Sequence, residues 1–445
     1  HDERGEISAP SPGGIAYAVF NGASWERSDL VLIPHDDGLG EGEWVDRRGD
    51  RLPAQRSEEG WHVLARGLKP MGIGVIRFQP AKGRAQRAEA TDPAPFRYSD
   101  GRLDTPYYLI EWNREGMLTR LYDKRAERDV LAPGALGNVL QVFEDRPKNR
   151  HEAWDIDIFY REKMDRVDDL QSVEPVESGP LRFVVRFAWK YNRSVIKQDM
   201  IAYSQSARID FKTWVDWHER RKLLKVAFPV DIRATEATYD IQFGNVRRPT
   251  HWNTSWDYAR FETVGHQWAD LSEGGYGVSL LNDCKYGYDI KDNVMRLSLI
   301  KSAMVPDEQA DQGEHRFTYS LYPHEGDWRA AGTVKEAWSL NLPVAAVKGE
   351  PLRPDVSLLH ADAGHVMIDA VKKAEDTGDV IVRIHEYMGA RGKVTLRSDF
   401  PVDAWRETDL LERPLGPWSN EGEMTLTFRP YEIKTLAVRF RCLPT

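Results

Sequence analysis

Residues 209–217 alternate apolar and polar side chains along most of their length, which is the pattern of a β-strand with one buried face. Ile209, Phe211 and Val215 would share one face of this strand, and Asp210 would lie on the other. Strand-like runs, separated by glycine and proline turns, recur along almost the whole chain without a convincing long amphipathic helix. The sequence therefore predicts an all-β fold of antiparallel sheets.

Turn-rich and proline-rich stretches divide the predicted strands into three groups. A chain of 445 residues is long enough for several domains, each with its own core. We predict a large antiparallel supersandwich flanked by two smaller β-sandwich domains. We expect an N-terminal tail at 1–14, the first small sandwich at 15–80 and a linker at 81–95. The supersandwich is expected at 96–342, a second linker at 343–357 and the C-terminal sandwich at 358–445.

Charge and apolar content exclude several classes of protein. The formal net charge of −9, without a basic stripe, argues against a nucleic-acid partner. No apolar run approaches the ~20 residues that a membrane-spanning helix needs. The chain opens with a charged, then proline- and glycine-rich stretch rather than a signal peptide, and Cys284 and Cys442 lie far apart. We expect reduced cysteines, a cytoplasmic location and no membrane.

The richest mixture of aromatic and polar residues lies at positions 243–292. This stretch holds three of the 15 tryptophans of the chain, together with histidines, arginines and carboxylates. Aromatic rings pack against the apolar faces of sugars, while polar side chains bind the hydroxyl groups. The stretch therefore favours a carbohydrate site, although a tryptophan is first of all a core residue.

A first candidate group lies upstream of this stretch. Asp155 and Asp157 are two residues apart, so in a strand they would point to one face, and Trp154 precedes them. Paired carboxylates can act on a sugar as acid and base, or bind a cation. The simpler interpretation is a pair of aspartates that accept hydrogen bonds from turn amides, and sequence alone favours it.

A second group contains Arg248, His251, Asn253 and Trp256, which could bind hydroxyl groups and stack on a sugar. A lone histidine is more often a structural hydrogen-bond partner. His251 and His266 do not occur in a spacing typical of zinc sites. We therefore assign no metal.

A third group follows a strand that we expect to be buried. Asp283, Lys285, Tyr286 and Tyr288 surround Gly287. The end of a buried strand is a common place for ligand contacts, but a hairpin turn explains the same residues equally well. Both interpretations stay open.

Several stretches together resemble glycoside hydrolase family 38 alpha-mannosidases of the cytosolic/vacuolar and bacterial branch. The similarity covers nearly the whole chain, in the family's order. The stretches are NGASWERSDLV at 21–31, FEDRP at 143–147, AWDID at 153–157, QFGNVRRPTHWNTSWDYARFE at 242–262, HQWADLSEGGYGVSLLNDCKYGYD at 266–289, LYPHEGDW at 321–328, VKKAED at 371–376 and RPYEIKTL at 429–436.

The resemblance implies that this chain is the C-terminal portion of such an enzyme, with a supersandwich similar to galactose mutarotase. In the family, an upstream barrel and helical bundle carry the nucleophile and the zinc ion. The implied reaction is retaining hydrolysis of terminal alpha-D-mannosides in mannose and oligosaccharide metabolism. The chain is expected to hold no cofactor, to be inactive alone, to support the barrel and to line the substrate cleft.

The implied partners are mannosides or oligosaccharides, the barrel and the bundle, and other copies in a homo-oligomer. No residue of this chain is assigned a catalytic role. Residues expected at the substrate rim or at the barrel interface are Trp154, Asp155, Asp157, Arg248, His251, Asn253, Trp256, Asp283, Lys285, Tyr286 and Tyr288.

Two other functions remain compatible with these residues. One is a stand-alone, mutarotase-like sugar enzyme, in which His251 or His266 would act with Asp155, Asp157 or Asp283. The other is a carbohydrate-binding module without catalysis.

Overall fold

The computed structural model describes residues 13–36, 38–81, 94–148 and 151–441. The tail predicted at 1–14 and the linker predicted at 81–95 lie almost entirely outside these residues, as does Cys442. Strands dominate the described part of the chain, which confirms the predicted all-β fold. No helix in these four ranges is long and apolar enough to cross a membrane.

The chain forms two compact units. Unit 2 is continuous in sequence and spans residues 92–341. Unit 1 combines residues 1–91 with residues 342–445, so that unit 2 is inserted between its two parts.

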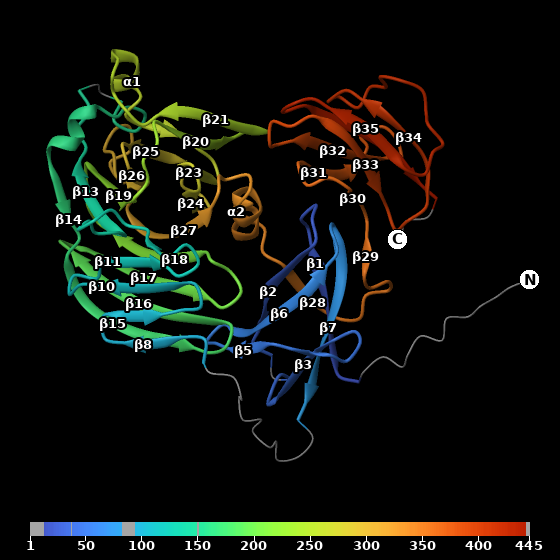
Figure 1. Cartoon of the computed structure of the whole chain (residues 1–445), viewed down its shortest axis with the longest axis horizontal. Helices are drawn as coiled ribbons and strands as arrows, with labels where there is room; N and C mark the ends of the chain where they lie inside the picture. Colours follow the sequence, from blue (N-terminus) through green and yellow to red (C-terminus); the bar gives the residue numbers. More distant parts are fainter. Residues whose placement is uncertain (1–12, 37, 82–93, 149–150, 442–445) are drawn as a thin grey trace, which may run out of the picture. The chain divides into compact units, whose positions relative to one another are not determined.

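Unit 2 contains a large sheet, a central sheet and a small sheet, all antiparallel (Figure 1). The large sheet has the order β15-β16-β17-β18-β27-β24-β23-β20-β21, the central sheet β14-β13-β19-β26-β25-β22, and the small sheet β12-β11-β10-β9-β8. The strands of the large sheet are β15 Asp169–Ser178, β16 Arg182–Tyr191, β17 Ser194–Tyr203, β18 Ile209–Trp217, β20 Glu236–Ile241, β21 Gly244–Pro249, β23 Trp268–Ser272, β24 Tyr276–Asn282 and β27 Gly313–Glu325.

The other two sheets of unit 2 use shorter strands. Those of the central sheet are β13 Val139–Glu144, β14 Met164–Arg166, β19 Lys222–Pro229, β22 Thr263–Val264, β25 Gly287–Lys291 and β26 Val294–Lys301, and those of the small sheet are β8 Arg97–Ser99, β9 Arg102–Asp104, β10 Tyr108–Trp112, β11 Leu118–Asp123 and β12 Arg128–Asp129. Helical segments are η1 Ile158–Glu162, α1 Ser255–Ala259 and α2 Thr333–Asn341.

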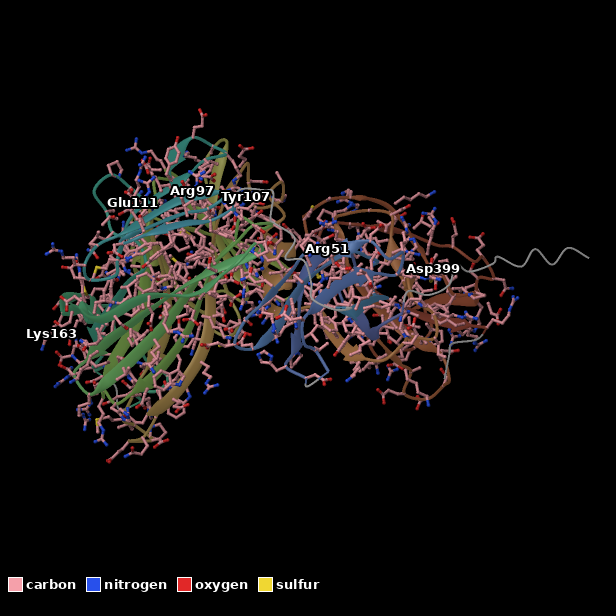
Figure 2. All side chains as sticks on the ribbon, turned by 90° about the horizontal axis from the view of Figure 1, so that it is seen from below. Arg51, Arg97, Tyr107, Glu111, Lys163 and Asp399 are labelled. Atoms are coloured by element: carbon pink, nitrogen blue, oxygen red, sulfur yellow. The ribbon has the colours of Figure 1, made fainter. Side chains whose placement is uncertain are left out.

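The large and central sheets face each other across the main core of unit 2. Phe211 of β18 stacks on Tyr319 of β27, with ring centroids 5.2 Å apart. On the facing sheet, Phe228 of β19 lies 5.8 Å from Phe211. All three rings are fully buried, so the inward residues of both sheets form a sandwich core. The small sheet adds Leu103, Ile110 and other inward residues to the same core, while its outer face carries charges such as Arg97 and Glu111 (Figure 2).

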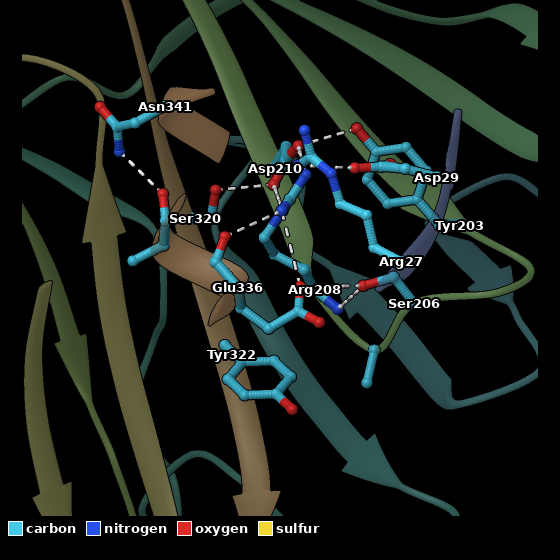
Figure 3. Close-up of polar contacts among 12 residues, drawn as sticks. Arg27, Asp29, Tyr203, Ser206, Arg208, Asp210, Ser320, Tyr322, Glu336 and Asn341 are labelled. Atoms are coloured by element: carbon cyan, nitrogen blue, oxygen red, sulfur yellow. Dashed lines mark hydrogen bonds and ion pairs between the residues drawn. The ribbon is translucent and has the colours of Figure 1, made fainter. Parts of the chain in front are cut away.

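One buried carboxylate lies on the predicted polar face of β18. Asp210 accepts hydrogen bonds from Arg208 Nε (2.7 Å), the Tyr203 hydroxyl (2.7 Å) and the Ser320 hydroxyl (2.6 Å) (Figure 3). Arg208 Nη1 also donates to the backbone oxygen of Glu336 in α2, at 3.2 Å. These five residues, the Asp210 network, attach α2 to the large sheet.

Unit 1 contains two β-sandwiches. In the first, the sheet β28-β1-β7-β3-β4, to which β29 is added beside β7, faces the sheet β2-β6-β5. In the second, the sheet β31-β32-β36-β34 faces the sheet β30-β33-β35. The strands are β1 Ile15–Asn21, β2 Arg27–Pro34, β3 Gly42–Asp46, β4 Arg51–Leu52, β5 Ala54–Arg56, β6 Gly60–Leu68, β7 Gly72–Pro80, β28 Ala345–Lys348, β29 Val356–Ser357, β30 His360–Ala361, β31 Val366–Lys373, β32 Val380–Glu386, β33 Gly392–Arg397, β34 Val402–Thr408, β35 Met424–Phe428 and β36 Ile433–Phe440.

The segment 343–357, predicted to be a linker, is partly built into the first sandwich. Its strand β28 pairs with β1, with Val19 opposite Ala346, and β29 pairs with β7. Val344 is buried in the same core as Trp44 and Phe78. Short strands between proline and glycine residues look like a linker in sequence, because their partner strands lie more than 270 residues away.

Candidate functional site

Two long connections of unit 2 carry the candidate residues. The first joins β13 to β14 and includes η1, and the second joins β21 to β22 and includes α1. The two connections contact each other, because the ring of Tyr160 lies 6.3 Å from that of Phe261 and the guanidinium of Arg161 lies 4.7 Å from the ring of Trp252. Residues far apart in sequence are therefore brought together.

Exposed aromatic side chains stand on both connections and on a neighbouring turn. Trp154 is 71% exposed and Trp256 is 76% exposed, values that core packing does not explain. Phe159 and Tyr258 are also exposed, and so is Tyr286 on the neighbouring turn, whose backbone oxygen accepts a hydrogen bond from Gly265. We call these five exposed side chains, Trp154, Phe159, Trp256, Tyr258 and Tyr286, the aromatic surface.

Asp155 and Asp157 do not lie in a strand, contrary to one interpretation of their spacing. Both lie in the irregular segment between a turn at 152–154 and η1, and Asp157 is the N-cap of η1. The Asp157 carboxylate accepts a hydrogen bond from the backbone N–H of Lys148 at 2.8 Å, and the backbone N–H of Asp155 donates to His151. The simpler interpretation, in which an aspartate satisfies a turn amide, therefore holds for Asp157.

His251 and Asn253 belong to the turn that begins α1. His251 Nδ1 accepts from the backbone N–H of Asn253 at 3.4 Å and lies 3.6 Å from an oxygen of Asp257. Asp257 and Thr254 exchange the two hydrogen bonds of a capping box. This local network fixes the start of α1, and it leaves the Trp256 ring pointing to the surface.

The third candidate group separates into surface and core residues. Lys285 places its ammonium group 4.7 Å from the ring of Phe317, and Asp283 accepts from the backbone N–H of Thr318 at 2.9 Å. Tyr288, in contrast, is completely buried and its hydroxyl is 2.6 Å from Asn282 Nδ2. The expectation that Tyr288 contributes to a rim is therefore wrong, because β25 turns its side chain inward.

The structure does not pair the histidines with the carboxylates proposed for a mutarotase-like enzyme. In the described ranges, the ion pair of His251 is with Asp257, whereas the ring of His266 lies 5.4 Å from that of Tyr286. No group of three His, Cys, Asp or Glu side chains in these ranges has the geometry of a metal site.

A buried charge cluster links the two long connections to the central sheet, and sequence analysis missed it. Lys225 of β19 is fully buried and forms ion pairs with Glu262 and with Asp289, the latter at 3.7 Å. Asp289 also pairs with Arg161 and, at 3.5 Å, with Arg296. The signal in the sequence was a lysine inside LLKVAF, an otherwise apolar run at 223–228.

The five residues Arg161, Lys225, Glu262, Asp289 and Arg296 together form the Lys225 cluster. Tyr160 completes it, because its hydroxyl donates to Glu262 at 2.7 Å and lies 3.2 Å from Asp289. Burial lowers the pKa of Lys225 to about 7; Asp289 opposes this shift, and the two arginines reinforce it.

The Lys225 cluster joins both long connections to the central sheet. Tyr160 and Arg161 come from the first connection and Glu262 from the second, whereas Lys225, Asp289 and Arg296 stand on β19, β25 and β26. Since Lys225 has no exposed surface, a substrate cannot reach it. The cluster therefore fixes the two connections on the central sheet, with Lys225 at its buried centre.

A serine, a histidine and an aspartate meet in the large sheet, but they do not form a catalytic triad. His324 Nε2 contacts Asp270 at 2.8 Å and Ser279 at 3.2 Å, so one nitrogen serves both partners. A triad needs different nitrogens for the two roles. All three side chains are buried, and the group is structural.

Two family models match the chain. The model described as "Glycosyl hydrolases family 38 C-terminal domain" matches residues 103–309, and "Glycosyl hydrolases family 38 C-terminal beta sandwich domain" matches residues 365–436. The first match covers most of unit 2 and the second lies in the last sandwich of unit 1.

Longer proteins resemble nearly the whole chain. Alpha-mannosidase G of Dictyostelium discoideum is 38% identical over 444 residues, which cover 94% of this chain and 40% of that protein. Human alpha-mannosidase 2C1 is 36% identical over 443 residues, covering 97% of this chain and 40% of the relative. The chain thus spans about 40% of the length of these relatives. The crystal structure of an alpha-mannosidase from Enterococcus faecalis shares the fold, with a TM-score of 0.75, 14% identity, and coverage of 96% of this chain and 56% of that one.

Proposed function

Because this chain belongs to glycosyl hydrolase family 38, we propose that it is the non-catalytic C-terminal part of a cytoplasmic, retaining alpha-mannosidase. In this proposal it supports a zinc-dependent catalytic barrel and lines part of the substrate cleft. The matched models describe C-terminal domains, and the relatives that share the chain's sequence are more than twice as long.

The observation that carries the proposal is the aromatic surface. Exposed aromatic residues on contacting connections are costly in a soluble domain, and they mark surfaces that a partner or a ligand covers. The Lys225 cluster holds both connections in place. We therefore assign this surface to the interface with the catalytic part and to the rim of its cleft.

The chemistry in this proposal belongs to the catalytic part. There, a carboxylate attacks the anomeric carbon and displaces the leaving group, which a second carboxyl group protonates. That second group, now a carboxylate, then activates the water that releases mannose. This chain contributes the wall that positions the sugar and excludes water.

Reconstitution tests the proposal. We expect the chain alone to release no product from an aryl alpha-mannoside, with or without zinc, and a mixture with the separately produced N-terminal part of the parent enzyme to be active. Trp256→Ala should weaken that reconstitution at least tenfold, whereas Leu352→Ala, which alters an even more exposed apolar residue of unit 1, should not. Turnover by the chain alone would contradict the proposal.

The exposed tryptophans also favour a second candidate, a carbohydrate-binding module. Trp154 and Trp256 offer ring faces of the kind on which sugars stack, beside the polar groups of Asp155 and Asn253. Calorimetry with mannose and mannobiose separates the two functions. A module gives saturable heat that disappears in Trp256→Ala, whereas a supporting domain gives none.

A further inference from the structure

Helix α1 projects from the end of unit 2 and carries Trp256 and Tyr258 of the aromatic surface (Figure 1). None of its residues is buried. Among the residues that the structure describes, residues 253–260 form hydrogen bonds only within the segment 251–260, the capping box included. We call residues 253–260 the α1 arm. Since a surface helix normally buries one apolar face, the α1 arm needs another form of attachment to unit 2.

Trp252, which directly precedes the α1 arm, provides this attachment. The Trp252 ring meets the Tyr258 ring edge-on, with the centroids 5.4 Å apart and an angle of 80° between the ring planes. Two cations also lie against the Trp252 ring, because the guanidinium carbon of Arg161 is 4.7 Å and the ammonium nitrogen of Lys291 is 5.1 Å from its centroid. The electrons of an indole ring attract such cations. The half-buried Trp252 ring therefore connects the arm, through Tyr258, to two residues outside it.

Both cations are themselves held by the body of unit 2. Arg161 forms an ion pair with Asp289 of β25, inside the Lys225 cluster. Lys291 ends β25 and pairs with Asp292 at 2.8 Å, and the backbone N–H of Asp292 donates to the backbone oxygen of the buried Thr250 at 2.8 Å. A continuous series of contacts thus leads from the buried cluster through Arg161 and the Trp252 ring to the α1 arm.

We propose that Trp252 is a positioning residue, which holds the α1 arm in the orientation in which Trp256 contacts the catalytic part. This inference rests on the proposed function, which assigns the aromatic surface to the interface with that part. An arm that is fixed before binding avoids the loss of conformational entropy that ordering a loose segment would cost. A general stabilising role would also explain the ring contacts of Trp252, but it predicts effects on all of unit 2 rather than on the arm alone.

Limited proteolysis of the chain alone tests the attachment. Trypsin cleaves after Arg260, an exposed residue at the end of the α1 arm, and mass spectrometry measures the rate at this site. We expect Trp252→Ala to raise this rate at least about fivefold and to leave cleavage at other sites unchanged, because only the arm loosens.

Two further variants serve as controls for proteolysis. Trp252→Phe keeps an aromatic ring and should restore the cleavage rate of the unchanged chain. Trp214→Ala removes another half-buried tryptophan that has a lysine against its ring, Lys197 at 5.3 Å, but that stands on β18. This variant should leave cleavage after Arg260 unchanged.

Reconstitution with the catalytic part tests what the attachment is for. The measured quantity is the concentration of the chain that gives half-maximal activity. Trp252→Ala should raise this concentration at least about tenfold, as we expect for Trp256→Ala. The double variant should raise it by much less than the product of the two single effects, because Trp252 acts through the arm that carries Trp256.

The results that would overturn the proposal are distinct. Unchanged cleavage after Arg260 in Trp252→Ala would remove the attachment, whereas faster cleavage at every site, or single effects that multiply in the double variant, would assign Trp252 to the stability of unit 2 as a whole. If the unchanged chain does not activate the catalytic part, the proposed function fails, and the role of Trp252 in binding fails with it. Proteolysis does not depend on the catalytic part, so the two failures are distinguishable.

Discussion

The Asp210 network and the Lys225 cluster are both buried charge groups of unit 2, but their charges balance differently. In the Asp210 network, the Asp210 carboxylate pairs with the Arg208 guanidinium and accepts two hydroxyl hydrogen bonds. In the Lys225 cluster, three cations share the carboxylates of Glu262 and Asp289.

The difference in balance decides the direction of the pKa shift. Burial alone lowers the pKa of a base, and it does so for both Arg208 and Lys225. For Arg208, the attraction of Asp210, Tyr203 and Glu336 outweighs burial, and the net pKa is raised. For Lys225, the two arginines add repulsion to burial, and the pKa falls to about 7. The direction of the pKa shift of a buried base therefore depends on its charged partners as well as on burial.

The largest effect should come from removing a carboxylate of the cluster. Asp289→Asn leaves Lys225, Arg161 and Arg296 with Glu262 alone, and we expect the free energy of unfolding to fall by about 3–5 kcal/mol. Urea unfolding measures the change. Asp292→Asn, at a side chain that is 70% exposed, should change stability by less than about 0.5 kcal/mol. Equal effects of the two substitutions would mean that the cluster is not stabilised by its charges.

Lys225→Met should remove a pH dependence that the Asp210 network lacks. The pKa of Lys225 is about 7 in the folded chain and 10.5 as the ordinary value, so the unfolded chain binds the extra proton between these limits. The free energy of unfolding should therefore rise with pH, by up to about 1.4 kcal/mol per pH unit from pH 7 to pH 9.5. Below pH 7 Lys225 is protonated in both the folded and the unfolded chain, so its contribution to the free energy of unfolding no longer changes with pH.

Urea titrations of both proteins at pH 6, 7, 8 and 9 measure this slope. The unchanged chain should gain stability relative to Lys225→Met over the last two pH units. Parallel pH profiles would contradict the assignment of the shift to Lys225.

Two tyrosines allow a direct comparison of the two groups. Tyr160 reaches two carboxylates, at 2.7 and 3.2 Å, whereas Tyr203 donates to Asp210 alone, at 2.7 Å. We expect Tyr160→Phe to lower the free energy of unfolding by about 2 kcal/mol and Tyr203→Phe by about 1 kcal/mol. Since phenylalanine keeps the ring, the difference measures the hydroxyl contacts. The reverse order would show that the Asp210 network depends more strongly on its hydroxyl group.

The smallest effect on stability should come from the aromatic surface itself. Trp154→Ala and Trp256→Ala remove rings that are 71% and 76% exposed, and we expect changes below about 0.5 kcal/mol. The same variants should bind the catalytic part more weakly in a pull-down measurement. A large loss of stability would instead make these rings part of the fold.

Local pattern was enough to predict the strands, because alternation depends on neighbouring residues only. Strand β18 covers Ile209–Trp217, the segment in which alternation was strongest. The buried state of Asp210 did not follow from that pattern, since its cover comes from Arg208, Tyr203 and Ser320. Alternation describes which side a residue faces but not what lies on that side.

The candidate site was harder to predict, because its key contacts are distant in sequence. Lys225 meets Asp289 through the pairing of β19 with β26 and of β26 with β25, a register that no local motif specifies. Tyr288 was misplaced for the same reason, since a tyrosine beside a turn glycine looks exposed until its strand is paired. The exposed tryptophans could be recognised from the sequence, because the turns and polar residues around them are their sequence neighbours.

The pairing of β1 with β28 has a consequence for the order in which the protein is made. Roughly 320 residues separate these strands, so at about 5–20 residues per second a ribosome needs on the order of 15–65 s between them. Unit 2 emerges in that interval and has all its strands available to fold. The N-terminal sheet, in contrast, must wait with the β1 edge unpaired. Nascent chains stalled just before residue 345 should therefore be the forms of this protein that chaperones hold longest.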